Sequence, residues 1–360
     1  MRKYQYWLSN IPGIGNRTIH HLIQMYGDAR EVYFSKESRL QAVPKLSKTQ
    51  QESILESKKT WNLERQEEKL QESGISFFCI ENDDFPEKIR NIYDAPYSFY
   101  CKGKLPDQKE KSIAIVGARR CSEYGRAVAL ELGEKFAKEN VSVISGMALG
   151  IDAFGHWGAI RGKGKTYAVL GCGVDVCYPP TNRSLYEKIL QTGGIISEYP
   201  IGTQPVAKLF PARNRLISAF SDAVIVVEAR RKSGSLITAD FALEQGKDIY
   251  AVPGGIYDDL SLGCNDLIRQ GAGIVTGANA LLTDLNFTSS DDMEQLTLEK
   301  ILLEKHESLV YSCVDLRPRS IDELLRKTGL SVQELILTVT ALQEKNLIEE
   351  SFKNYYIRRN

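Results

Sequence analysis

The residues best suited to chemistry are basic side chains gathered around Phe210. Between residues 205 and 232 there are six basic residues and two acidic ones, although Lys plus Arg and Asp plus Glu are both 46 over the whole chain. The basic residues are Lys208, Arg213, Arg215, Arg230, Arg231 and Lys232. Guanidinium and ammonium groups neutralise phosphates, and an aromatic ring stacks on a base. This segment therefore favours holding a nucleic-acid strand over transforming a small molecule.

Each of these residues also has a structural alternative. Phe210 suits a core position, and residues 230–232 suit a solvated loop. Because buried cations need partners, at least two of Lys208, Arg213 and Arg215 should face a ligand or a carboxylate.

The elements that position this cluster are predicted by continuous apolar runs, which are typical of strands buried on both faces. The runs are Ile113–Val116, Val141–Ile144, Ala168–Leu170, Ala223–Val227 and Ile249–Val252. Helical stretches separate them at 124–139, 152–161 and 236–245. Alternation of this kind predicts βαβ units and a doubly wound, Rossmann-like parallel sheet.

Small residues follow these strands and should gather at the carboxyl edge of the sheet. They are Gly117, Ser145-Gly146, Gly171 and Gly173, and Ser233-Gly234-Ser235. Helix N-termini and bare amides attract anions at this edge. Arg119 directly follows the first of these turns, so we expect a phosphate contact there rather than a plain surface charge. Several phosphate sites in one crevice indicate a dinucleotide or a nucleic-acid strand.

The dinucleotide alternative is weak because G-x-G-x-x-G is absent after the first strand. The turn at 117–125 lacks the second and third glycines and carries two arginines instead. A nucleotide hydrolase signature beginning at Pro253-Gly254-Gly255 lacks its later glycine, threonine and glutamate. We therefore expect no cofactor.

Asp152 and His156 are spaced for one helix face and are the main candidates for acid–base chemistry. We favour a structural role for both, since Asp152 falls where a carboxylate caps a helix. A hydrolase acting on a mononucleotide remains the alternative function. We otherwise expect no catalytic residues.

Composition indicates a globular protein, with 42% apolar and 26% charged residues. The first residues lack the apolar core of a signal peptide, and no later run is long enough for a bilayer. Seven scattered cysteines without paired zinc-type spacing predict reduced thiols, no metal site and a cytoplasmic location.

Composition also divides the chain. We expect an N-terminal helical module at 1–73, a connecting arm at 74–108, a Rossmann-like DNA-binding domain at 109–285, a linker at 286–295 and a winged-helix-like module at 296–360. The turn at Ile11–Gly15 resembles that of helix-hairpin-helix modules, which contact either DNA or protein. In the last module, helices are expected from Thr297 to Lys305, from Ser320 to Thr328 and from Ser331 to Lys345, followed by a hairpin. The third helix is poor in cations before Lys345, which argues for partner binding or weak DNA binding.

Several motifs together resemble the DNA-processing protein A (DprA, also called Smf) family. They include residues 115–119, Ser145-Gly146-Met147-Ala148, Gly150-Ile151-Asp152, Tyr178-Pro179, residues 197–200, Phe210-Pro211-x-Arg213-Asn214-Arg215, residues 227–229 and 233–239, Ala251-Val252-Pro253-Gly254 and residues 261–268. The similarity spans essentially the whole length.

The resemblance implies a Rossmann-like core that binds single-stranded DNA without strong sequence preference. It further implies that the protein helps load RecA recombinase onto that strand during natural transformation, or competence, and recombination. It implies homodimerisation through the Rossmann-like domain and no enzymatic activity. Carried over by motif, the DNA-binding positions are Gly117, Arg119, Lys208, Phe210, Arg213 and Asn214, to which the residues themselves add Arg215, Ser233, Gly234 and Ser235. Leu149 departs from the family, where relatives often place a basic residue.

Overall fold

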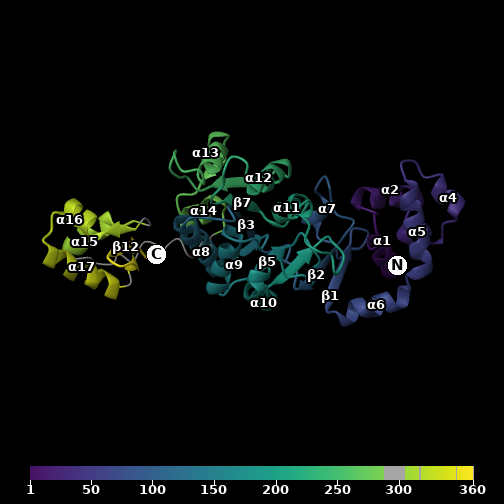
Figure 1. Cartoon of the computed structure of the whole chain (residues 1–360), viewed down its shortest axis with the longest axis horizontal. Helices are drawn as coiled ribbons and strands as arrows, with labels where there is room; N and C mark the ends of the chain where they lie inside the picture. Colours follow the sequence, from purple (N-terminus) through teal and green to yellow (C-terminus); the bar gives the residue numbers. More distant parts are fainter. Residues whose placement is uncertain (288–304, 316–317, 346, 360) are drawn as a thin grey trace.

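A nine-stranded, mostly parallel sheet forms the centre of the molecule (Figure 1). The computed structural model describes residues 1–287, 305–315, 318–345 and 347–359. The strand order is β1-β2-β6-β5-β4-β3-β7-β8-β9. The parallel strands are β3 (Ser112–Val116), β4 (Ser142–Ser145), β5 (Thr166–Val169), β6 (Gly194–Ser197), β7 (Ala223–Val226), β8 (Asp248–Ala251) and β9 (Gly273–Ile274). This arrangement confirms the predicted Rossmann-like core.

Helices bury both faces of the sheet, which is why its central strands are apolar throughout. Ile113 and Ile115 of β3 pack towards α8 (Glu123–Lys138), α9 (Ile151–Arg161) and α14 (Ala278–Asp284). Ala114 and Val116 pack on the other side, against α11 (Leu209–Phe220) and α12 (Gly234–Glu244). Two further helices of the α/β domain are α10 (Arg183–Thr192), which precedes β6, and α13 (Leu262–Arg269), which precedes β9.

The segment expected to be a connecting arm instead supplies two strands of the sheet. β1 (Ile75–Cys79) pairs antiparallel with β2 (Ser98–Gly103), and β2 pairs antiparallel with β6. The short helix α7 (Glu87–Arg90) lies between them. Residues of β1 alternate between buried and more exposed positions, because one face of this edge is covered by the N-terminal helices.

The N-terminal helices share a core with this edge of the sheet. They are α1 (Arg2–Ser9), α2 (Asn16–Tyr26), α3 (Ala29–Phe34), α4 (Glu37–Gln41), α5 (Lys48–Thr60) and α6 (Leu63–Glu72). Trp7 and Leu22 are buried in the same apolar cluster as Phe77 and Tyr100. Gly13 has a φ of 78° in the turn between α1 and α2, where a side chain would be strained.

The C-terminal residues form a separate small α/β unit. Its elements are α15 (Lys305–Cys313), β10 (Arg319–Ser320), α16 (Ile321–Thr328), α17 (Val332–Glu344), β11 (Ile348–Phe352) and β12 (Tyr355–Arg358). Ser320 and Ser331 each form a capping box, and Gly329 ends α16 with a φ of 68°. The two later helices and the hairpin are therefore confirmed. The helix expected from Thr297 and most of the expected linker lie outside the described residues.

Among the described helices, none combines the length and apolar character needed to cross a membrane. All seven cysteines are free, and burial raises the pKa of the Cys79, Cys101 and Cys264 thiols to about 12.

Candidate nucleic-acid interface

A crevice of about 290 Å³ opens where the order of the strands reverses. From β3 the chain proceeds outward through β4, β5 and β6, and it then returns to β7 on the other side of β3. In open α/β sheets, ligands bind at such a switch point, beyond the carboxyl ends of the strands. The crevice is lined by Val116, Gly117, Arg119, Ala148, Asp152, Ala207, Phe210, Pro211, Arg213, Asn214, Ile217, Ser233, Gly234, Ser235, Ile237 and Thr238.

The structure brings together all the site residues expected from the sequence except Lys208 and Arg215. Lys208 is exposed immediately before α11, next to Ala207 of the crevice lining. Within the described residues it forms no salt bridge, so its charge remains available at the rim. Arg119 is also exposed, on the loop that follows β3.

Phe210 lies half-buried in the first turn of α11 and contacts groups on several sides. The Arg119 and Arg213 guanidinium carbons lie 5.7 and 6.0 Å from its ring centroid. The Tyr178 ring stacks on it at 5.4 Å between centroids, with 28° between the planes. Gly171 lies so close that a Cβ there would be 2.7 Å from the ring atom Cδ1. Phe210 is therefore not part of the core, and its neighbours restrict the movement of its ring.

Arg213 lies beneath the crevice and is only 4% exposed. Its Nη1 donates to the carbonyl of Gly146, at 3.1 Å, and to that of Val169. Its neighbour Asn214 donates to the Gly234 carbonyl at 3.2 Å. This bond joins the middle of α11 to the first residue of α12, next to which the Ser233 and Ser235 hydroxyls lie 2.9 Å apart. α11 and the N-terminal part of α12 thus line the crevice as a connected pair.

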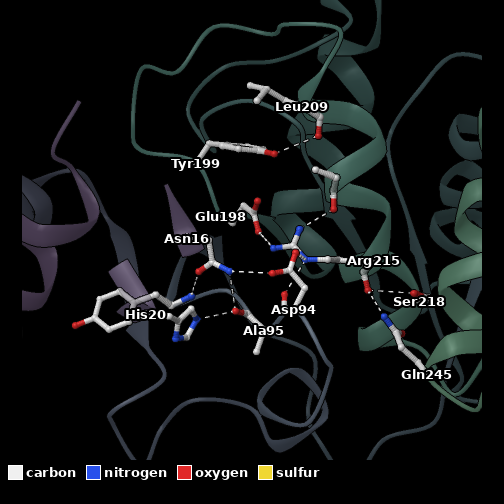
Figure 2. Close-up of polar contacts among 12 residues, drawn as sticks. Asn16, His20, Asp94, Ala95, Glu198, Tyr199, Leu209, Arg215, Ser218 and Gln245 are labelled. Atoms are coloured by element: carbon white, nitrogen blue, oxygen red, sulfur yellow. Dashed lines mark hydrogen bonds and ion pairs between the residues drawn. The ribbon is translucent and has the colours of Figure 1, made fainter. Parts of the chain in front are cut away.

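Arg215 is engaged by carboxylates outside the crevice lining (Figure 2). Its guanidinium forms ion pairs with Glu198 and with Asp94, the latter at 3.4 Å, and donates to the Ala212 carbonyl at 2.6 Å. Asp94 also accepts from Asn16 of α2 at 3.4 Å. The sequence analysis expected these cations to face either a ligand or a carboxylate. In the structure, Arg215 faces carboxylates.

Asp152 and His156 are both buried, and the structural interpretation explains their contacts. Asp152 accepts from the backbone N–H groups of Gly146 and Ala148 at 3.1 and 3.4 Å, so it fixes the loop after β4. Burial raises the pKa of this carboxyl, and the Arg213 guanidinium opposes that rise. His156 is 0% exposed, its Nδ1 lies 2.6 Å from the Thr166 hydroxyl, and burial lowers its pKa to about 3. Thr166 donates to the Val143 carbonyl, so Nδ1 of His156 is the donor to Thr166.

Tyr178 is the contact that reasoning from the sequence did not assign to the site. The sequence contained one signal for it, since Tyr178-Pro179 follows the glycine turn after β5 at the same edge of the sheet. In the described part of the chain, no group of three or more His, Cys, Asp or Glu residues is arranged to hold a metal ion.

The fold and the site define a Rossmann-like protein with a cationic, aromatic-bearing crevice at its switch point. Residues 76–286 match the family model described as DNA recombination-mediator protein A, and the chain belongs to that family. The match begins in β1, so the family's domain includes the two antiparallel strands.

Named relatives agree with this assignment. DNA processing protein DprA from Streptococcus pneumoniae is 42% identical over 58% of this chain and 74% of its own length. Protein Smf from Synechocystis is 29% identical over 98% of both chains. The X-ray structure of the Streptococcus pneumoniae protein superimposes with a TM-score of 0.69 at 34% identity, covering 79% of this chain and 98% of that one.

A second solved structure concerns the single-stranded DNA binding mode of DNA processing protein A from Helicobacter pylori. It matches with a TM-score of 0.53 at 29% identity, over 59% of this chain and 95% of that one.

Proposed function

We propose that this chain binds single-stranded DNA, without strong sequence preference, in the crevice at the carboxyl edge of β3. It then helps load RecA recombinase onto the bound strand in natural transformation and recombination, and it leaves the DNA chemically unchanged. The observation that carries the proposal is the exposed Arg119 against the Phe210 ring, beside the N-terminus of α12, together with the exposed Lys208 two residues before Phe210. The family description and the DNA binding of the Helicobacter pylori relative support it.

Each residue has a distinct part in this proposal. Arg119 and Lys208 neutralise phosphates, and Phe210 belongs to the surface on which bases stack. Gly117, Ser233, Gly234 and Ser235 offer backbone amides and hydroxyls to phosphate oxygens. Arg213 contributes positive charge from beneath the crevice, Asn214 fixes α11 to α12, and Arg215 holds α11 in place through its carboxylates.

The main test is the double variant Arg119→Ala and Lys208→Ala, measured by gel-shift titration with oligo-dT at several salt concentrations. Loss of two phosphate contacts should weaken binding and lower the slope of log K against log salt by roughly 1.4, because each contact on a single strand contributes about 0.7. The thermal midpoint should stay unchanged, since both side chains are exposed.

A matched control removes two positive charges at the opposite edge of the sheet, through Lys138→Ala and Arg161→Ala near the ends of α8 and α9. Both side chains pair with Glu134 and are exposed. The control should bind as the unaltered chain does. Equal affinity of both double variants would refute the assignment of the crevice.

The rival function is hydrolysis of a mononucleotide, and it is favoured by the Asp152 carboxylate in the crevice lining. Incubation with a panel of nucleotides, followed by detection of released base, separates the two. Turnover that disappears in Asp152→Asn would replace the DNA-binding proposal. Binding of proteins alone, without salt-sensitive DNA binding, would support an adaptor instead.

The proposal also includes a cytoplasmic location and homodimerisation through the Rossmann-like domain. Light scattering with and without oligo-dT measures whether the chain forms a dimer. Delivery of recombinase is measured by the rate at which RecA filaments form on strands covered by a single-strand binding protein.

A further inference from the structure

The ring of Phe210 is covered by a second aromatic residue. Tyr178 lies 5.4 Å away between centroids with 28° between the planes, which is an offset stack. Rings in such a stack are in contact, so no base fits between them without moving one. The guanidinium of Arg119 lies over the Phe210 ring, and the backbone at Gly171 packs against its edge. A base that stacks on this pair of rings must therefore contact the free face of the more exposed ring.

Of the two stacked residues, Tyr178 is the more exposed. Its exposed fraction is 37%, whereas Phe210 is half-buried. Within the described residues its hydroxyl forms no hydrogen bond, although a buried structural tyrosine usually has one. The ring therefore leaves apolar surface in water, which burial against a ligand would remove.

The loop that carries Tyr178 is firmly attached to the crevice. Asn182 donates to the Met147 carbonyl at 2.9 Å and so connects this loop to the one after β4. On its other side, the Gly173 N–H donates to the Thr203 carbonyl at 2.9 Å, and Asp175 accepts from the Gly202 N–H at 2.9 Å. A ring held in this way loses little conformational entropy when a ligand stacks on it.

We propose that Tyr178 and Phe210 form a two-ring platform, and that the outer face of Tyr178 receives a base of the bound strand. The inference rests on the proposed function and makes it specific. Arg119 and Lys208 then hold the phosphates on either side of the stacked base, while Phe210 supports the receiving ring from behind. A flexible single strand can turn its bases onto this platform, whereas a duplex keeps them stacked inside.

The test uses the full chain and oligo-dT with one internal 2-aminopurine, whose fluorescence falls when it stacks on an aromatic ring. Tyr178→Leu should abolish most of the quenching and weaken binding by about 5- to 150-fold, the range of one lost stacking contact. The salt slope should not change, because the ring carries no charge, whereas Arg119→Ala should lower it by about 0.7. Tyr178→Phe should bind and quench as the unaltered chain does.

Tyr93→Leu is the matched control, because Tyr93 is fully exposed and lies outside the crevice lining. It should leave binding unchanged. Normal quenching and affinity in Tyr178→Leu, or losses in Tyr178→Phe as large as those in Tyr178→Leu, would overturn the platform alone. Absence of salt-sensitive oligo-dT binding by the unaltered chain would overturn the proposed function as well.

Discussion

Two arginines that lie two residues apart in α11 have different partners, and this difference separates their roles. Arg213 donates to backbone carbonyls below the crevice, and among the described residues no carboxylate in direct contact neutralises its charge. Arg215 lies against Glu198 and Asp94, so its charge is matched. Buried charges are tolerated in proteins when they are paired and hydrogen-bonded, as Arg215 is. We therefore propose that Arg215 stabilises the fold rather than contacting a strand directly.

Replacing Arg215 with Ala should lower the free energy of unfolding by about 3–5 kcal/mol, because Glu198, whose side chain is only 13% exposed, would be left without this partner. Urea unfolding followed by circular dichroism measures this loss. In contrast, Arg231→Ala removes an exposed ion pair with Asp266 and should cost no more than about 1 kcal/mol. A loss for Arg215→Ala as small as that of Arg231→Ala would mean that its carboxylates are well solvated.

For single residues, the sequence predicted which side chains lie close together at the crevice, but not which partners contact them. The cluster around Phe210 and the glycine turns were predictable because parallel strands end at one edge of the sheet. The partners of Arg215 were not, since Asp94 and Glu198 come from distant segments. The stack of Tyr178 on Phe210 depends on the path of a long loop, which local pattern does not determine.

Among the elements, α8 and α9 approach each other unusually closely through glycines. A Cβ on Gly158 would collide with the Leu130 carbonyl oxygen, and a Cβ on Gly133 with the Gly155 carbonyl oxygen. Close packing of these helices places the beginning of α9, with Asp152, against the loop after β4. The geometry of the crevice floor thus depends on a contact on the opposite face of the sheet from α11.

Gly158→Ala should therefore destabilise the protein by about 1–3 kcal/mol, although alanine favours a helix, because the backbones must separate. Differential scanning calorimetry measures the change. Gly15→Ala is the control, since a methyl group on Gly15 would meet no atom within 4 Å and the residue has a φ of −91°. A neutral or stabilising effect of Gly158→Ala would show that the two helices shift apart easily.

The central strands were predictable as elements, whereas the edges of the sheet were not. The runs that became β3, β4, β5, β7 and β8 are apolar on both faces, which is a strong local signal. β9 has two residues, and β6 contains only two consecutive apolar residues, Ile195 and Ile196, which is too short an apolar run to predict a strand. β1 and β2 carry aromatic residues near prolines, a pattern that also suits a loop, so only their pairing with β6 identifies them as part of the sheet.

At the scale of the whole molecule, the two terminal modules relate differently to the sheet. The core of the N-terminal helices continues into β1 and β2, and Asn16 and His20 also bond to the loop before β2. The C-terminal unit has an apolar core of its own around Leu324, Leu335 and Ile348. Folding of the sheet should therefore depend on the first module and not on the last.

Removal of residues 288–360 should leave oligo-dT affinity intact and shift the main thermal transition by less than about 4 °C. Removal of residues 1–73 should expose Phe77 and Tyr100 and cause aggregation or loss of cooperative unfolding. Calorimetry and gel shifts on both shortened chains measure these effects. A loss of DNA affinity in the first shortened chain would assign part of the binding to the C-terminal unit.

The pairing of β3 with β7 has a consequence for synthesis of the chain. The N–H of Ser112 at the start of β3 donates to the carboxylate of Asp222, 110 residues later. As a protein leaves the ribosome, the apolar edge of β3 therefore stays uncovered until β7 has emerged. Nascent chains with such uncovered strand edges are the ones most prone to aggregate and to need chaperones. The junction of β3 and β7, which borders the crevice in the folded protein, is thus an unpaired strand edge for much of translation.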